Sequence, residues 1–203
     1  MIRIDSMTEQ EISEIAEAFA DYNYASNEKG MLYLFPDRER LINYLKVMIH
    51  SALKCHMVYG TSENKEGVII LTDTTNPMPF IPMVKLFVSM VKALGFKTFN
   101  NFVKHAQSGG GSIEAKFRKE KKQFIQVEML AVRKQFQGQG HMRTLLNTAF
   151  ELADTKNLPC IVVTDAALKK DKYVHLGMTL VNTRQIDEGA YMYDMVRRGK
   201  NKS

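Results

Sequence analysis

The sequence of 203 residues has little of what marks disulfide-rich, metal-binding or membrane-spanning proteins. Its two cysteines, Cys55 and Cys160, are too few for a disulfide framework, and no group of His, Cys and carboxylate residues has metal-ligand spacing. No stretch approaches the roughly 18 consecutive apolar residues of a membrane span, and the first residues lack the apolar core of a signal peptide. These absences predict a reduced, cytoplasmic protein that uses no metal.

The composition is that of a globular domain, with 45% hydrophobic and 25% charged residues. A chain of this length can bury a sizeable core in one domain. The net charge is +6, but the densest basic run, Lys116–Lys122, is neither interleaved with stacking aromatics nor part of a nucleic-acid motif. We therefore expect no nucleic acid and no membrane as partner, and interpret the run as a solvated face.

The most informative segment spans residues 127–146. Val127–Val132 is an apolar run suited to a buried strand, and Gly138 and Gly140 follow in a turn. Apolar residues then recur at helical spacing, which predicts a helix from about Gly140 to Lys156. A strand, a glycine turn and a helix direct unpaired backbone N–H groups and the positive end of the helix dipole toward one spot. Such a spot binds phosphate.

The details of this turn distinguish among phosphate-binding motifs. The lysine and hydroxyl pair of a Walker loop is missing, and residues 138–143 lack the third glycine of a Rossmann loop. What is present, from Gln135 to Gly140 after Leu130-Ala131-Val132, resembles the Gln/Arg-x-x-Gly-x-Gly/Ala signature of the Gcn5-related N-acetyltransferase (GNAT) superfamily.

A second segment has a similar resemblance. Residues 159–164 form a β-branched apolar run typical of a buried strand. Farther on, Tyr173-Val-His-Leu-Gly177-Met178 resembles the superfamily's Tyr-x-x-x-Gly-Phe element, with Met178 in place of the usual Phe. Many members carry a cofactor-contacting Asn shortly before this Tyr, whereas this chain has Ala166, Lys169, Lys170 and Asp171 there. The detailed resemblance covers about residues 123–195.

The resemblance implies a fold. It is a single α/β domain over residues 1–203, with a mixed, mostly antiparallel sheet flanked by helices and splayed at the cofactor strand. Between paired strands predicted at 57–61 and 67–72 and the Leu-Ala-Val strand, about fifty residues intervene. We expect a helical insertion at about 76–115, with helices ending at Gly95 and spanning Thr98–His105, and a triple-glycine connector. This insertion is a candidate lid over the acceptor site.

The resemblance also implies acetyl-coenzyme A as cosubstrate, with no metal. The expected cofactor-binding residues are those of the strand end and the turn: Leu130, Ala131, Val132, Gln135, Gln137, Gly138, Gln139, Gly140, His141 and Met142. The backbone of Leu130 and Val132 can pair with the pantetheine amides as an added strand would.

Two residues are candidates for the chemistry. In families of this kind a Tyr at the position of Tyr173 gives a proton to the coenzyme A sulfur; the alternative is an aromatic residue that only packs. Glu128 would lie beside the thioester, facing away from Val127 and Met129, with its pKa raised by partial burial so that it can act as a base. Its alternative role is a strand-face carboxylate paired with a lysine.

The function implied is acetyl transfer to a primary amine of a small molecule, by direct attack in a ternary complex. The alternatives are acetylation of a protein lysine or N-terminus, and a non-catalytic acyl-coenzyme A-binding module. The chain is expected to be a monomer or a homodimer.

Overall fold

The computed structural model describes residues 2–22, 28–96, 99–100 and 111–199. The strands are β1 (Ile2–Arg3), β2 (Val58–Gly60), β3 (Gly67–Asp73), β4 (Ile125–Val132), β5 (Cys160–Thr164), β6 (Thr179–Asp187) and β7 (Ala190–Arg197). The α-helices are α1 (Glu9–Ala20), α2 (Arg38–Lys54), α3 (Phe80–Leu94), α5 (Ile113–Lys119), α6 (His141–Lys156) and α7 (Ala167–His175). Two short 3₁₀ helices are η1 (Met31–Leu34) and η2 (Lys134–Phe136).

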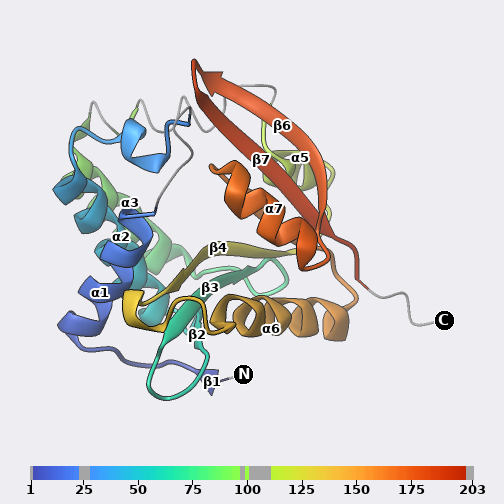
Figure 1. Ribbon diagram of the computed structural model, residues 1–203, viewed down its shortest axis with the longest axis horizontal. Helices are drawn as coiled ribbons and strands as arrows, with labels where there is room; N and C mark the ends of the chain where they lie inside the picture. Colours follow the sequence, from blue (N-terminus) through green and yellow to red (C-terminus); the bar gives the residue numbers. More distant parts are fainter. Residues whose placement is uncertain (1, 23–27, 97–98, 101–110, 200–203) are drawn as a thin grey trace.

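The strands form one mixed sheet in the order β1-β2-β3-β4-β5-β7-β6 (Figure 1). All neighbouring strands are antiparallel except β4 and β5, which are parallel. Helix α6 makes the crossover connection that two parallel strands require. This is the single-domain α/β architecture that the resemblance implied.

Helices cover both faces of the sheet. On one face, α1 and α2 pack against β2, β3 and β4 through a core that includes Ile15, Leu45, Ile70 and Met129. On the other face, α6 and α7 pack through a core that includes Leu145, Val127, Tyr173 and Met195. Met178 is buried in this second core, so it fills the apolar space that the family's usual Phe would fill.

The sheet opens in its middle. β4 and β5 pair only at Ile125↔Cys160, Gln126↔Ile161 and Val127↔Val162, and the strands then separate. The separation leaves the edge of β4 beyond Val127 without a neighbouring strand on that side. The expected splay of the sheet at the cofactor strand is therefore confirmed.

Local sequence signals fix several helix starts. Thr8 and Glu11 form a capping box, in which the Thr8 hydroxyl accepts from the Glu11 N–H and the Thr8 N–H donates to the Glu11 carboxylate. Asp37 caps α2 by accepting from the Arg40 N–H. None of the described helices is long and apolar enough to cross a membrane.

The insertion differs from the expected lid. Its first helix, α3, packs against α2 and adds no residue to the cavity described below. The end of the insertion contacts β4 instead, because Glu114 of α5 accepts a hydrogen bond of 3.2 Å from Gln126 on β4. The helix expected at Thr98–His105 and most of the triple-glycine connector lie outside the described residues.

Candidate active site

The turn after β4 presents backbone donors. Among the described residues, none accepts a hydrogen bond from the N–H groups of residues 138–142, which surround the start of α6. Gly138 and Gly140 have φ of +79° and +85°, a region that side-chain-bearing residues avoid. Apart from the adjacent residues, no atom of the described chain lies within 4 Å of where either glycine's Cβ would be, so the space before these donors is open. The turn therefore has the geometry of an anion site.

Three glutamines brace this turn. The Gln137 side chain donates to the Val132 carbonyl at 3.1 Å, and the Gln139 side chain donates to the Gln135 carbonyl at 3.3 Å. The Gln135 amide donates to Glu14 on α1, so this side chain points away from the cavity. Of the ten expected cofactor-binding residues, Gln135 and Gln139 are the two that do not line the cavity.

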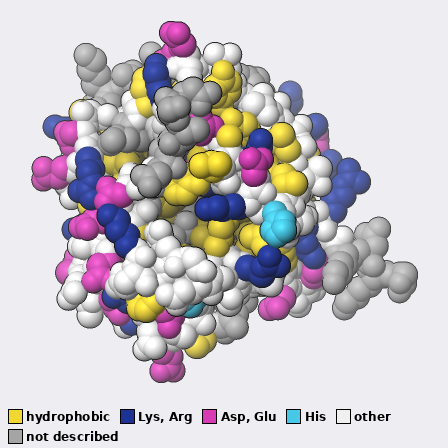
Figure 2. Space-filling model, viewed as in Figure 1, with side chains coloured by type: hydrophobic (Ala, Val, Ile, Leu, Met, Phe, Trp, Pro, Cys, Tyr) yellow, Lys and Arg dark blue, Asp and Glu magenta, His cyan; other side chains and the backbone are white. Residues whose placement is uncertain are grey.

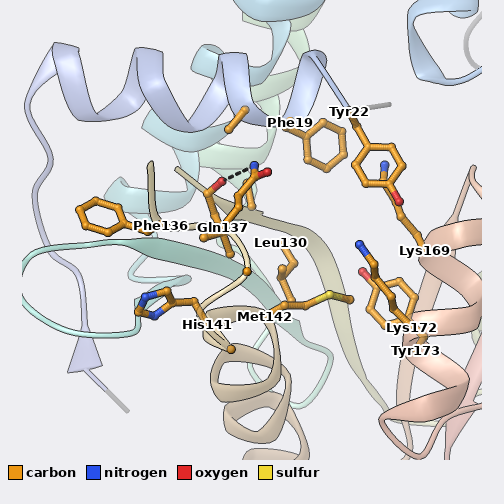
Figure 3. Close-up of a pocket in the computed structure, with 15 residues that line it drawn as sticks. Phe19, Tyr22, Leu130, Phe136, Gln137, His141, Met142, Lys169, Lys172 and Tyr173 are labelled. Atoms are coloured by element: carbon orange, nitrogen blue, oxygen red, sulfur yellow. Dashed lines mark hydrogen bonds between the residues drawn. The ribbon is translucent and has the colours of Figure 1, made fainter. Parts of the chain in front are cut away.

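A cavity of about 380 Å³ lies between this turn, the end of β4, α1 and α7. Figure 3 shows Met142 from the α6 start and Leu130 from β4 on one side of it, with Tyr173 and Lys172 of α7 opposite. Phe19 of α1 and Tyr22, just after this helix, close the remaining wall. On the face in Figure 2, Lys and Arg side chains stand among hydrophobic ones near the middle of the molecule. The cavity thus combines apolar walls with positive charge at its rim.

The open edge of β4 forms part of this cavity. The N–H of Arg133 donates to Glu66 on the β3 side, and donors alternate along a strand. The N–H groups of Leu130 and Val132 therefore point toward the open side, where β5 no longer pairs. This edge can accept an extended chain containing amides.

Tyr173 is buried at the α7 wall of the cavity, 6% exposed. Burial, followed by the negative charge of Asp165, holds the pKa of the Tyr173 phenol well above its usual value. Within the described chain, no protein group hydrogen-bonds its hydroxyl. The phenol is therefore a protonated group that can donate into the cavity.

Glu128 occupies a β-bulge. Ile70 of β3 pairs with Met129, and the next residue, Leu71, pairs with Val127, so Glu128 is the extra residue. Val127 packs in the α6 core and Met129 in the core of α1 and α2. The expectation that Glu128 lies opposite both neighbours was therefore wrong, because the bulge interrupts the alternation of the strand.

The Glu128 carboxylate belongs to a polar cluster with Thr72, Gln126 and Glu114. It accepts from the Thr72 hydroxyl at 2.7 Å and from the Gln126 amide at 3.1 Å, and the same amide donates to Glu114. Glu128 is exposed on its outer side, but the protein atoms around its carboxylate exclude part of the water. This desolvation, opposed by the Thr72 hydrogen bond and reinforced by the charge of Glu114, raises the pKa of Glu128 to about 7. Among the described residues, no lysine forms an ion pair with it.

Sequence reasoning missed a group of residues around the start of α7. Glu28 accepts from the Ala167 N–H at 2.8 Å and from the Tyr193 hydroxyl at 3.3 Å, and Asp165 accepts from the Met31 N–H at 2.8 Å. These contacts tie the segment after α1 to α7 across more than 130 positions, a distance at which no sequence pattern points to them.

Lys169 lies in the stretch where related sequences carry Asn. Its ammonium pairs with Asp165 at 3.1 Å and lies 4.2 Å from the centre of the Tyr22 ring. Both Lys169 and Tyr22 line the cavity. Two other aromatic residues that follow α1 lie elsewhere, because Phe35 packs in the core and Tyr33 is exposed.

Residues 102–173 match the model of the acetyltransferase (GNAT) family, a range that includes β4, the turn and α6 and ends at Tyr173. Over this segment, 72 of the 203 residues, the chain resembles the GNAT acetyltransferase family. Members of this family use acyl-coenzyme A, and the open edge of β4, the unpaired N–H groups and the cationic rim fit such a molecule. No curated protein sequence matched the chain.

Several solved structures share the GNAT fold over nearly the whole chain. PH1933 from Pyrococcus horikoshii is 12% identical, with a TM-score of 0.56 and coverage of 98% of this chain and 96% of its own. Arylalkylamine N-acetyltransferase 2 from Aedes aegypti is 13% identical, with a TM-score of 0.56 and coverage of 95% and 96%. A histone acetyltransferase HPA2 and related acetyltransferase from Corynebacterium glutamicum is 13% identical, with a TM-score of 0.55 and coverage of 97% and 96%. At these identities the likeness concerns the fold.

Proposed function

We propose that this GNAT acetyltransferase transfers an acetyl group from acetyl-coenzyme A to a primary amine of a small molecule, by direct attack in a ternary complex. One observation carries the proposal: unpaired backbone donors at the start of α6 and the protonated Tyr173 hydroxyl border the same cavity, beside the open edge of β4. An anion site, an amide-pairing edge and a proton donor are what such a cosubstrate requires.

The chain would hold the cosubstrate at two places. The N–H groups of residues 138–142 would donate to its pyrophosphate, assisted by the positive end of the α6 dipole. The N–H groups of Leu130 and Val132 would pair with the pantetheine amides. Lys172, which has no ion-pair partner among the described residues, would add positive charge at the rim. The bound molecule supplies the thioester whose acyl group is transferred.

Glu128 would act as the base, directly or through a water molecule. An amine attacks a carbonyl only when it is neutral, so the ammonium form of the acceptor must first lose a proton. A carboxylate with a pKa of about 7 accepts that proton more effectively near neutral pH than an ordinary glutamate. The nearby charge of Glu114 would also attract a cationic acceptor.

Tyr173 would act as the acid. The departing sulfur needs a proton, and a buried phenol with a raised pKa keeps its proton until a thiolate forms beside it. The absence of a hydrogen-bond partner for this hydroxyl within the described chain leaves it available to the ligand.

A thiol-release assay with acetyl-coenzyme A tests this proposal. The acceptor panel contains arylalkylamines, polyamines, aminoglycosides, amino acids, lysine-containing peptides and peptides with free N-termini. Turnover of small amines with products acetylated on nitrogen supports the proposal. Turnover of peptides alone indicates the protein-acetylating alternative. Binding of acetyl-coenzyme A without turnover of any acceptor indicates a binding module.

A further inference from the structure

The first half of α3 exposes an apolar surface that the acetyltransferase chemistry does not use. Phe80 is 72% exposed and Ile81 is 65% exposed, and their neighbours share this exposure. The α3 apolar surface consists of Phe80, Ile81, Met83, Val84, Phe87 and Val88. Isolated exposed hydrophobic residues are ordinary, but a contiguous group of six on one helix marks an interaction site.

The other end of α3 holds this surface in place. Met90, Val91 and Leu94 pack in the core beneath α1 and α2, and the Leu94 carbonyl accepts a hydrogen bond of 3.1 Å from Arg40 on α2. The apolar surface therefore lies on the exposed first half of a helix whose last turns are anchored in the core. Because the last turns of α3 are packed in the core, the helix exposes these side chains while it remains folded.

The segment that carries this surface has charge of one sign. Residues 74–113 contain no Asp or Glu and four lysines, of which Lys85 and Lys92 lie exposed on α3. At about 100° per residue, Lys85 and Lys92 fall close together at one border of the apolar arc. A helix with bulky apolar side chains on one side and lysines at its border has the pattern of a helix that lies in a bilayer interface.

We propose that the α3 apolar surface docks this protein on anionic lipid bilayers. The apolar side chains would enter the boundary between headgroups and acyl chains, while Lys85 and Lys92 would meet the lipid phosphates. A second copy is the less suitable occupant, because a symmetric contact through α3 brings lysines together in a segment with no acid to neutralise them. The expectation of no membrane partner rested on the lack of a spanning segment, which a surface-lying helix does not need.

Flotation of the full chain with lipid vesicles tests the proposal. The protein is expected to float with vesicles of phosphatidylcholine and phosphatidylglycerol, to float less with phosphatidylcholine alone, and to be released by salt. Ile81→Glu should lower the partition coefficient about tenfold or more, because it places a charge in the apolar contact. Substituting both lysines, Lys85→Gln with Lys92→Gln, should lower it about fivefold per lysine.

Val181→Glu is the matched control, since Val181 is a half-exposed residue on β6 and the substitution adds the same charge elsewhere. Circular dichroism establishes that both variants are folded. Equal flotation of Ile81→Glu and Val181→Glu would overturn the proposal. A wild-type protein that does not float with anionic vesicles would also overturn it. A dimer in analytical ultracentrifugation that Ile81→Glu dissociates, without vesicle binding, would assign the surface to a second copy instead.

Discussion

The Thr72 hydroxyl donates a 2.7 Å hydrogen bond to the Glu128 carboxylate across the boundary between β3 and β4. Because Glu128 is the extra residue of a β-bulge, its side chain meets Thr72 on the side of the sheet that also carries Glu114. Thr72 favours the charged form of the carboxylate, while burial favours the neutral form. The balance between these two effects sets the pH at which Glu128 can accept a proton.

Thr72→Val tests that balance. The substitution keeps the shape of the side chain but removes the donor, so the pKa of Glu128 should rise above about 7. If Glu128 is the base, the rising limb of the profile of kcat/KM against pH should move to higher pH. Thr72→Ser, which keeps the hydroxyl, should leave the limb near its original position. A limb that stays unchanged in Thr72→Val would separate Glu128 from the rate-determining proton transfer.

Glu128→Gln should make the protein more stable at alkaline pH. The pKa of Glu128 is higher in the folded protein than in the unfolded chain, so folding favours its protonated form. Its contribution to the free energy of unfolding is therefore complete below the unfolded pKa and is lost as the pH rises through the folded pKa of about 7. The variant has no charge to bury, so above pH 7 its free energy of unfolding should exceed that of the wild type by about 1 kcal/mol, a value reduced for the solvent contact of this side chain. Below pH 4 the two proteins should agree.

Urea denaturation at several pH values measures this difference. The control is Glu63→Gln, which neutralises an exposed carboxylate in the turn between β2 and β3. Its effect should not grow across the same pH range. If the free energy of unfolding of Glu128→Gln differed from that of the wild type by the same amount at every pH, the charged Glu128 carboxylate would not destabilise the folded protein.

Tyr173→Phe should lower kcat by one to three powers of ten, about the range of general acid catalysis. The KM for acetyl-coenzyme A should change little, because the hydroxyl acts mainly when the sulfur departs. Tyr59→Phe on β2 removes a hydroxyl outside the cavity and should leave both constants near wild type. Steady-state kinetics with an acceptor found in the panel provide the measurement. Unaltered kcat in Tyr173→Phe would leave protonation of the sulfur to solvent.

The sequence predicted those parts of the fold that depend on neighbouring residues. The strand β4, the helix starting after Gly140 and the paired strands β2 and β3 each follow from short-range periodicity or turn chemistry. The separation of β4 and β5 followed from the resemblance. Eight of the ten expected cofactor-binding residues line one cavity with Tyr173.

What the sequence did not predict depends on contacts between distant residues. The bulge at Glu128 exists only in relation to the register of β3, so a strand pattern cannot reveal it. Glu28 and Asp165 tie the segment after α1 to α7 through contacts between residues more than 130 positions apart. The short helix α5 was interpreted as a charged surface because its few apolar residues, Ile113 and Phe117, pack on Phe124 only in the folded protein.

The central claim is that the turn after β4 binds the pyrophosphate of coenzyme A, and a pair of substitutions at Gly138 tests it most directly. Asn and Asp have similar shapes and both tolerate positive φ, so Gly138→Asn and Gly138→Asp should alter the turn alike and differ only in charge. Titration calorimetry with coenzyme A should show that Gly138→Asp binds at least about tenfold more weakly than Gly138→Asn, with a gap that narrows as salt increases. The same pair at Gly95, whose φ is +75° and which does not line the cavity, should show no difference in affinity. Equal affinities for the two Gly138 variants in folded protein would contradict binding of the pyrophosphate at this turn.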